Sequence, residues 1–89
     1  MNDDIGAPGL AYSERAQLWM QKGMPEQAYD DLTKALEKDV NPSFLKARID
    51  VSTALKNLQA VNQDLAALKK LAEKDAAAKG YIDKLNAPH

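Results

Sequence analysis

Apolar residues recur every three or four positions along two stretches of the N-terminal half, a spacing that places them on one face of an α-helix. We expect the first helix to begin at Leu10. It should end at Lys22-Gly23, because a cation in the last turn followed by glycine is typical of a helix C-terminus. The spaced positions of this helix are Tyr12, Arg15, Ala16, Trp19 and Met20.

A second helix is expected to follow at once. Met24-Pro25-Glu26 favours a new start, since proline suits the first helical position and an acid there complements the helix dipole. Asn41-Pro42 both ends this helix and begins the next one, with Asn41 as the cap. Its apolar positions are Ala28, Leu32, Ala35 and Leu36, with Tyr29 beside them. The positions expected to face water are Asp30, Asp31, Thr33, Lys34, Glu37 and Lys38.

Residues 43–79 contain neither glycine nor proline. A single helix of this length would run about 55 Å, which is too long for so small a domain to cover. We therefore expect a break at Asn57-Leu58-Gln59. The first of the resulting helices would use Val51 and Leu55. The second would use Leu58, Val61, Leu65, Leu68, Leu71 and Ala72.

Lys79-Gly80 has the same features as Lys22-Gly23 and predicts another helix end. A short amphipathic closing segment would follow, with Tyr81, Ile82 and Leu85 on its apolar side. The sequence thus predicts one all-α domain over residues 10–86, made of two antiparallel helical hairpins and a short C-terminal capping helix. We expect a flexible tail at residues 1–9 and a frayed end at 87–89.

The two hairpins also look like copies of one unit. The segment KALEKD at 34–39 is echoed by KLAEKD at 70–75, an offset of 36. Periods of this size are a signature of helical repeat proteins. Ala16 and Ala28 would let the first two helices approach to about 8–10 Å, while bulkier residues fill the grooves beside them.

The first hairpin resembles the tetratricopeptide repeat (TPR) family. That family places an aromatic, a large, a small and a second aromatic residue on its first helix, followed by a glycine turn and then small and bulky apolar residues. The matching residues here are Tyr12, Arg15, Ala16, Trp19, Gly23, Ala28, Leu32, Ala35 and Leu36. Arg15 departs from the family's usual leucine, and Pro42 comes two positions late.

The resemblance weakens over residues 43–79. Continuing the same register puts Asp50 where a small residue is expected and Asn57 where glycine is expected. A generic four-helix bundle or helical hairpin is the alternative interpretation of the whole pattern.

The TPR resemblance implies an interaction module, an adaptor, scaffold or accessory domain that binds another protein. In that family the first helix of each hairpin lines a concave groove for an extended peptide or a partner helix. The matching groove residues are Leu10, Ser13, Gln17, Met20, Phe44, Ala47, Val51 and Leu55. The family's clamp for a terminal carboxylate uses lysine and asparagine where this chain has Ser13 and Gln17, so that ligand is not expected. Alternatively, some of these side chains belong to the core or to a dimer interface.

Composition and charge narrow the classes of partner. The 89 residues are 45% apolar and 28% charged, with a net charge of −1, which is typical of a soluble folded domain. The charge is uneven, −4 over residues 1–42 and +3 over the remainder. No strong positive field favours nucleic acid, and no apolar run approaches the roughly 20 residues of a membrane span. The acidic start lacks the apolar core of a signal peptide, and the compartment stays undetermined.

No constellation of residues predicts catalysis, a cofactor or a metal site. The chain has no cysteine, and its single histidine is His89, so zinc would lack suitable ligands. The carboxylate pairs Asp3-Asp4 and Asp30-Asp31 fall in the expected tail and on an expected polar face. Catalytic carboxylates instead need a shaped, partly desolvated pocket. We predict that the protein is not an enzyme.

Two hairpins alone leave an open edge, because repeats bury their faces against neighbours. Either the segment from Gly80 onward or a second copy of the chain would cover that edge, and we predict self-association as a homodimer. The competing function is a structural homo-oligomerisation element, in which one long helix over 43–79 pairs between chains. Its seam would be Leu55, Leu58, Val61 or Asn62, Leu65, Leu68, and Leu71 or Ala72. A helix break near Asn57 favours the repeat module.

Overall fold

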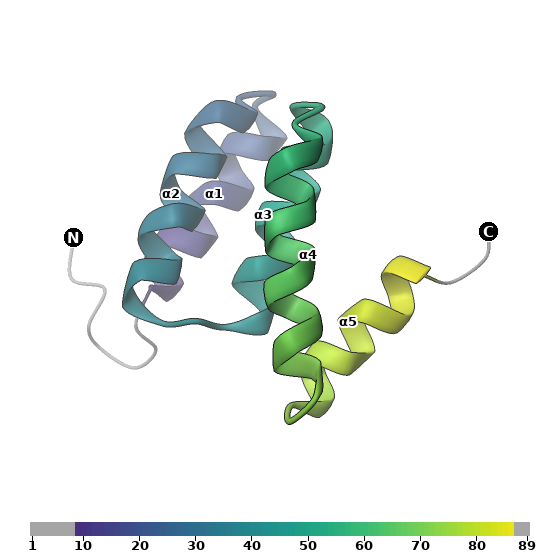
Figure 1. Ribbon diagram of the computed structural model, residues 1–89. Helices are drawn as coiled ribbons and strands as arrows, with labels where there is room; N and C mark the ends of the chain where they lie inside the picture. The colour runs from purple at the N-terminus through teal and green to yellow at the C-terminus, as the bar shows by residue number, and fades with distance from the viewer. Residues whose placement is uncertain (1–8, 87–89) are drawn as a thin grey trace.

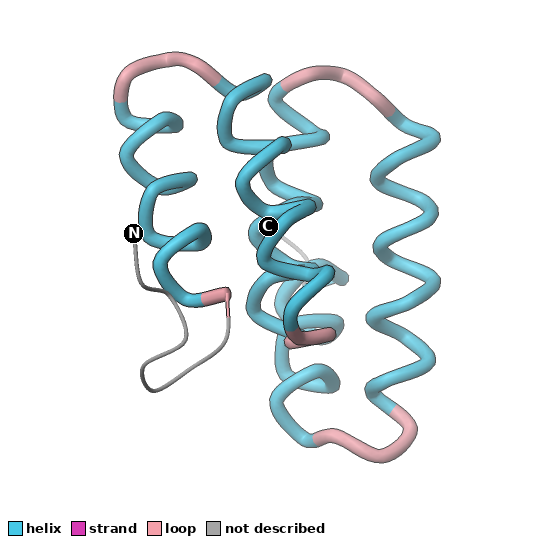
Figure 2. The backbone as a smooth tube through the Cα atoms, turned by 90° about the vertical axis from the view of Figure 1, so that its left-hand side faces the viewer, coloured by secondary structure: helices cyan, strands magenta, loops and turns pink. Residues whose placement is uncertain are grey.

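The computed structural model describes residues 9–86, which fold into five α-helices with no strand among them. The helices are α1 (Leu10–Gln21), α2 (Pro25–Lys38), α3 (Pro42–Ala54), α4 (Leu58–Ala72) and α5 (Ala76–Asn86). The pairs α1–α2 and α3–α4 form two antiparallel hairpins side by side, and α5 packs across α4 and α3 (Figure 1). The turns within the two hairpins lie at the same end of the molecule (Figure 2). The all-α class, with two hairpins and a closing helix, is confirmed.

The break expected near Asn57 is confirmed. α3 ends at Ala54, and Lys56 turns the chain with a left-handed φ of 59°. The Asn57 side chain then caps α4 by accepting a hydrogen bond from the backbone N–H of Ala60 at 3.2 Å. The continuous helix that the oligomerisation alternative requires is therefore not formed.

The helix end expected at Lys79-Gly80 was wrong. α4 already ends at Ala72, and Asp75 caps α5 by accepting hydrogen bonds from the backbone N–H groups of Ala77 and Ala78 at 2.8 and 3.3 Å. Gly80 lies inside α5, whereas Gly23 adopts the left-handed turn that was expected of it, with φ 74°. The cap at Asp75 allows one helix to run from Ala76 past the glycine.

The expected tail at residues 1–9 and frayed end at 87–89 fall outside the described residues, except for Gly9. Gly9 is buried and left-handed, with φ 81°. A Cβ at this position would stand 2.7 Å from the Ala35 carbonyl oxygen and 3.1 Å from the Phe44 ring. The chain is therefore already packed against α2 and α3 before α1 begins, which only glycine permits.

The small residues predicted at the first crossing are buried where α1 meets α2. Ala16 is 2% exposed and Ala28 is fully buried, in one cluster with Leu32 and with Val51 of α3. Of the other positions in the TPR pattern, Ala35 is buried and Tyr12, Trp19 and Leu36 are partly buried, whereas Gly23 in the turn is exposed. A second cluster joins α3, α4 and α5 through Leu45, Ile49, Leu68 and Ala78.

The two hairpins repeat with an offset of 33 residues. α2 and α4 start at Pro25 and Leu58, and α1 and α3 end at Gln21 and Ala54. The two left-handed turn residues, Gly23 and Lys56, keep the same offset. The repeat period of 36 that the segments KALEKD and KLAEKD suggested was therefore wrong. The register that placed Asp50 at a helix crossing was wrong for the same reason. Ile49, 3% exposed, is the counterpart of Ala16, and Asp50 is the counterpart of Gln17.

Candidate functional site

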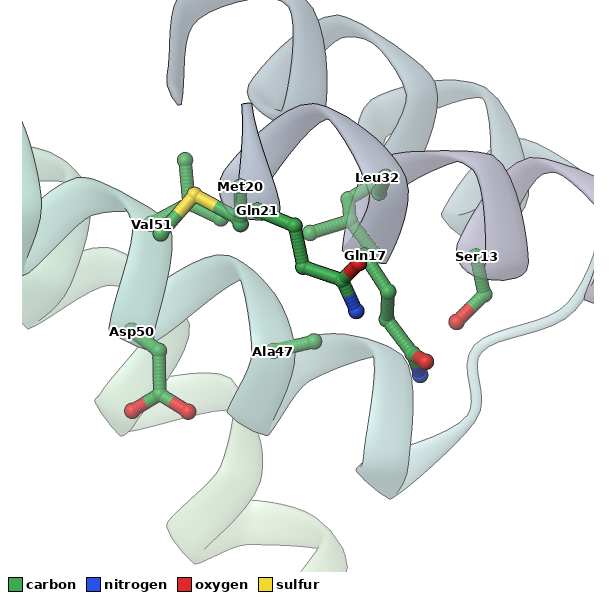
Figure 3. Close-up of a pocket in the computed structure, with 9 residues that line it drawn as sticks. Ser13, Gln17, Met20, Gln21, Leu32, Ala47, Asp50 and Val51 are labelled. Atoms are coloured by element: carbon green, nitrogen blue, oxygen red, sulfur yellow. The ribbon is translucent and has the colours of Figure 1, made fainter. Parts of the chain in front are cut away.

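A groove of about 390 Å³ runs between α1 and α3 (Figure 3). Its apolar floor and sides combine three helices, with Ala16 and Met20 from α1, Leu32 from α2, and Ala47 and Val51 from α3. Its polar groups are Ser13, Gln17, Gln21 and Asp50. An apolar hollow with a few hydrogen-bonding groups at its edges is the usual composition of a binding site.

The structure brings five of the eight predicted groove residues together. These are Ser13, Gln17, Met20, Ala47 and Val51. Among them Ser13 and Val51 are largely buried, at 8% and 2% exposed, so they form the floor of the groove.

The other three predicted residues lie elsewhere. Phe44 is 3% exposed and belongs to the core beside Gly9, because a ring at the start of α3 fills the gap left by the missing glycine side chain. Leu10 lies exposed at the first position of α1 and is not among the groove residues. Leu55 packs against the first core cluster and borders a separate hollow with Tyr29 of α2.

Sequence reasoning missed four residues that line the groove, Ala16, Gln21, Leu32 and Asp50. Gln21 could have been found one helical turn beyond Gln17, because residues four apart share a helix face. Asp50 could have been found from the correct offset of 33, which makes it the counterpart of Gln17.

An ion pair between a buried aspartate and a partly exposed arginine joins the two helices of the first hairpin. Arg15 of α1 donates two hydrogen bonds to the carboxylate of Asp31 in α2, from Nε at 2.8 Å and from Nη2 at 2.7 Å. Trp19 Nε1 donates a third at 2.9 Å. The expectation that Asp31 faces water was wrong, since it is 3% exposed. Arg15, which departs from the leucine of the TPR pattern, makes its side-chain hydrogen bonds to this carboxylate.

The second hairpin repeats the pair at the same offset. Arg48 of α3 donates to both carboxylate oxygens of Asp64 in α4, at 2.7 and 2.6 Å. It also donates to Thr33 Oγ1 at 3.1 Å and lies 5.4 Å from the centre of the Tyr29 ring, both in α2. Arg48 therefore links the two hairpins and holds α3 in position beside α2.

Hydrogen bonding within the pairs shifts the pKa of Asp31 and the pKa of Arg48. Hydrogen bonds from Arg15 lower the pKa of Asp31, although burial acts in the opposite direction. Hydrogen bonding to Asp64 likewise raises the pKa of Arg48 above its ordinary value, against the effect of its own burial. Both pairs lie at helix–helix contacts, and none of their four residues lines the groove.

Comparisons with protein-family models, with curated proteins and with solved structures found no match to this chain. Over residues 9–86, no helix combines the length and apolarity needed to cross a membrane. Within the same residues, no group of three or more His, Cys, Asp or Glu side chains is arranged to hold a metal ion.

Proposed function

We propose that this protein is an interaction module, an adaptor, scaffold or accessory domain without catalytic activity of its own, that binds a peptide segment of another protein between α1 and α3. The observation that carries the proposal is the groove, where an apolar floor built from three helices lies below exposed amides. The TPR resemblance of residues 10–42 supports this use of α1.

Small side chains keep the groove hollow. Ala16 of α1, Leu32 of α2 and Ala47 of α3 line it together. Burying apolar side chains of a guest on this floor would contribute about 25 cal/mol for each Å² removed from water. Exposed amides at the edge would satisfy the polar groups of the guest that lose water on binding.

The proposal also includes self-association, because α1 leaves an apolar side chain exposed at the edge of the two hairpins. Leu18 of α1 is 54% exposed, whereas its counterpart Val51 is 2% exposed because it packs on the preceding hairpin. The Leu18 side of α1 is thus the open edge of the pair of hairpins, and a second copy of the chain would cover it. Sedimentation should show a dimer that Leu18→Glu converts to a monomer, and a monomeric parent chain would contradict dimerisation.

Selection of peptides from a random display library against the whole chain tests the binding function. Selected peptides should lose binding to an Ala47→Arg variant, whose side chain would occupy the groove. They should keep binding to Ala66→Arg, which changes an exposed residue of α4 outside the groove. Circular dichroism establishes that both variants are folded. Equal binding to both variants, or no selected peptide, contradicts the proposal.

A further inference from the structure

The two amides on the α1 side of the groove form a short ladder. Gln17 and Gln21 are exposed, stand one turn apart, and extend across the groove toward Ala47 of α3 (Figure 3). Residues four apart on a helix are separated by about 6 Å along its axis. Each amide offers both a carbonyl acceptor and an N–H donor.

This spacing matches an extended guest. In an extended chain, residues i and i+2 present their groups on the same side about 6.6–6.8 Å apart, so two successive same-side backbone positions could each meet one amide. A helical guest satisfies its own backbone groups internally along its length. It would offer only side chains to Gln17 and Gln21, and the two amides would make no hydrogen bonds to its backbone.

The groove also carries a negative charge, which favours a positively charged guest. Asp50 is the one charged residue that lines it within residues 9–86. Its carboxylate bonds Lys46 Nζ at 2.6 Å, but the Asp50 side chain stays 53% exposed. An exposed pair of this kind contributes little stability. A cation brought by a guest can therefore approach the same carboxylate or replace Lys46.

Building on the function proposed above, we propose that the groove takes an extended peptide segment with a lysine or arginine side chain at Asp50. The guest backbone runs along α1 and exchanges hydrogen bonds with Gln17 and Gln21. Its alternate side chains lie over Ala47 and Val51, where the floor admits small or branched apolar groups.

The peptides from the display selection supply the probe for the backbone ladder. Each is resynthesised with a single N-methyl group at successive positions, which removes one backbone N–H at a time. Affinity should fall about five- to tenfold at two positions spaced by two residues, the cost of one lost hydrogen bond at each. Those losses should shrink when the Gln17→Met/Gln21→Met variant, of similar shape but without amides, replaces the parent chain.

The charge preference is tested on the same peptides. Most should contain lysine or arginine at one fixed position, and changing it to alanine should weaken binding to the parent chain. The Asp50→Asn variant should bind the lysine and alanine peptides equally. Lys46→Met, which removes the competing cation, should bind the lysine peptide at least as tightly as the parent chain.

Three results would overturn this inference while leaving the groove's binding function in place. They are peptides that bind as helices by circular dichroism, affinities indifferent to N-methylation, and a lysine preference that persists in Asp50→Asn. A selection without any peptide sensitive to Ala47→Arg would overturn both this inference and the function on which it rests.

Discussion

Arg48 and Asp64 form a two-point hydrogen-bonded pair between α3 and α4, and the same pair joins Arg15 and Asp31 between α1 and α2 at an offset of 33 residues. Both aspartates are nearly buried. Each hairpin is therefore held by hydrophobic packing together with one charged contact of fixed geometry. The two arginines lie on α1 and α3, the helices that form the sides of the groove.

Breaking the second pair from one side should destabilise the fold. Arg48→Met or Asp64→Leu alone should lower the free energy of unfolding by about 3 kcal/mol, because each leaves an uncompensated buried group. The double variant should lose clearly less than the sum, since an apolar pair can replace a buried ion pair. Urea unfolding measures all three. Lys46→Met, which breaks an exposed pair, is the control and should cost less than about 1 kcal/mol. Strictly additive losses would show that Arg48 and Asp64 do not act as a pair.

Acid should weaken the first hairpin through Asp31. The pKa of Asp31 is lowered in the folded state, so the unfolded chain binds the proton more readily. The stabilisation is complete above the unfolded-state pKa near 3.9 and is lost as pH falls from there through the folded-state pKa. Unfolding measured from neutral pH down to pH about 2 should therefore show a smaller acid dependence in Asp31→Asn than in the parent chain. Asp30→Asn, at the exposed neighbour, should retain the parent dependence, and equal curves for Asp31→Asn and the parent would contradict this role.

Enlarging the residue at the first helix crossing should overpack it. Ala28 is fully buried between α2 and α1, so Ala28→Leu should lower the free energy of unfolding by about 1–3 kcal/mol. Ala66→Leu adds the same volume at an exposed position of α4 and should change it by less than about 0.5 kcal/mol. Thermal or urea unfolding distinguishes them. Equal effects would mean that the crossing is not tightly packed.

Both hairpin turns should favour glycine. Gly23 and Lys56 occupy equivalent positions with φ of 74° and 59°. A side chain in this conformation costs about 1–2 kcal/mol, and a Cβ on Gly23 would have no neighbour within 4 Å. Gly23→Ala should therefore destabilise through the backbone alone. Lys56→Gly should stabilise by about 0.5–1 kcal/mol, after the greater flexibility of glycine in the unfolded chain is subtracted. Shifts of the melting temperature in the same direction would refute the equivalence.

Local signals made most of the helix boundaries predictable. Three of these signals are the glycine turn at Gly23 and the caps at Asn41 and Asn57. Each depends only on its own backbone or on the next few residues, so it can be recognised from the sequence. Lys79-Gly80 failed because a lysine-glycine step does not force a stop. The competing cap at Asp75 had already started a helix.

The repeat register and the two arginine–aspartate pairs could not be predicted in the same way. Arg15 and Asp31 are 16 residues apart on different helices, and each taken alone is compatible with a solvated helix face. Only the packing of α1 on α2 brings them together. The part of the groove that was found came from the TPR resemblance, which assigned the groove to the first helix of each hairpin. Asp50 was missed because its place in the groove depends on how α1 and α3 line up, whereas Gln21, one helical turn beyond Gln17, could have been included.

The most direct measurement is an NMR titration of the chain with a peptide selected for binding. Backbone amide signals that shift should cluster at Gln17, Gln21, Ala47 and Val51, and the Ala47→Arg variant should abolish the shifts while it remains folded. Shifts centred on α4 and α5, or shifts that survive in Ala47→Arg, would contradict binding between α1 and α3.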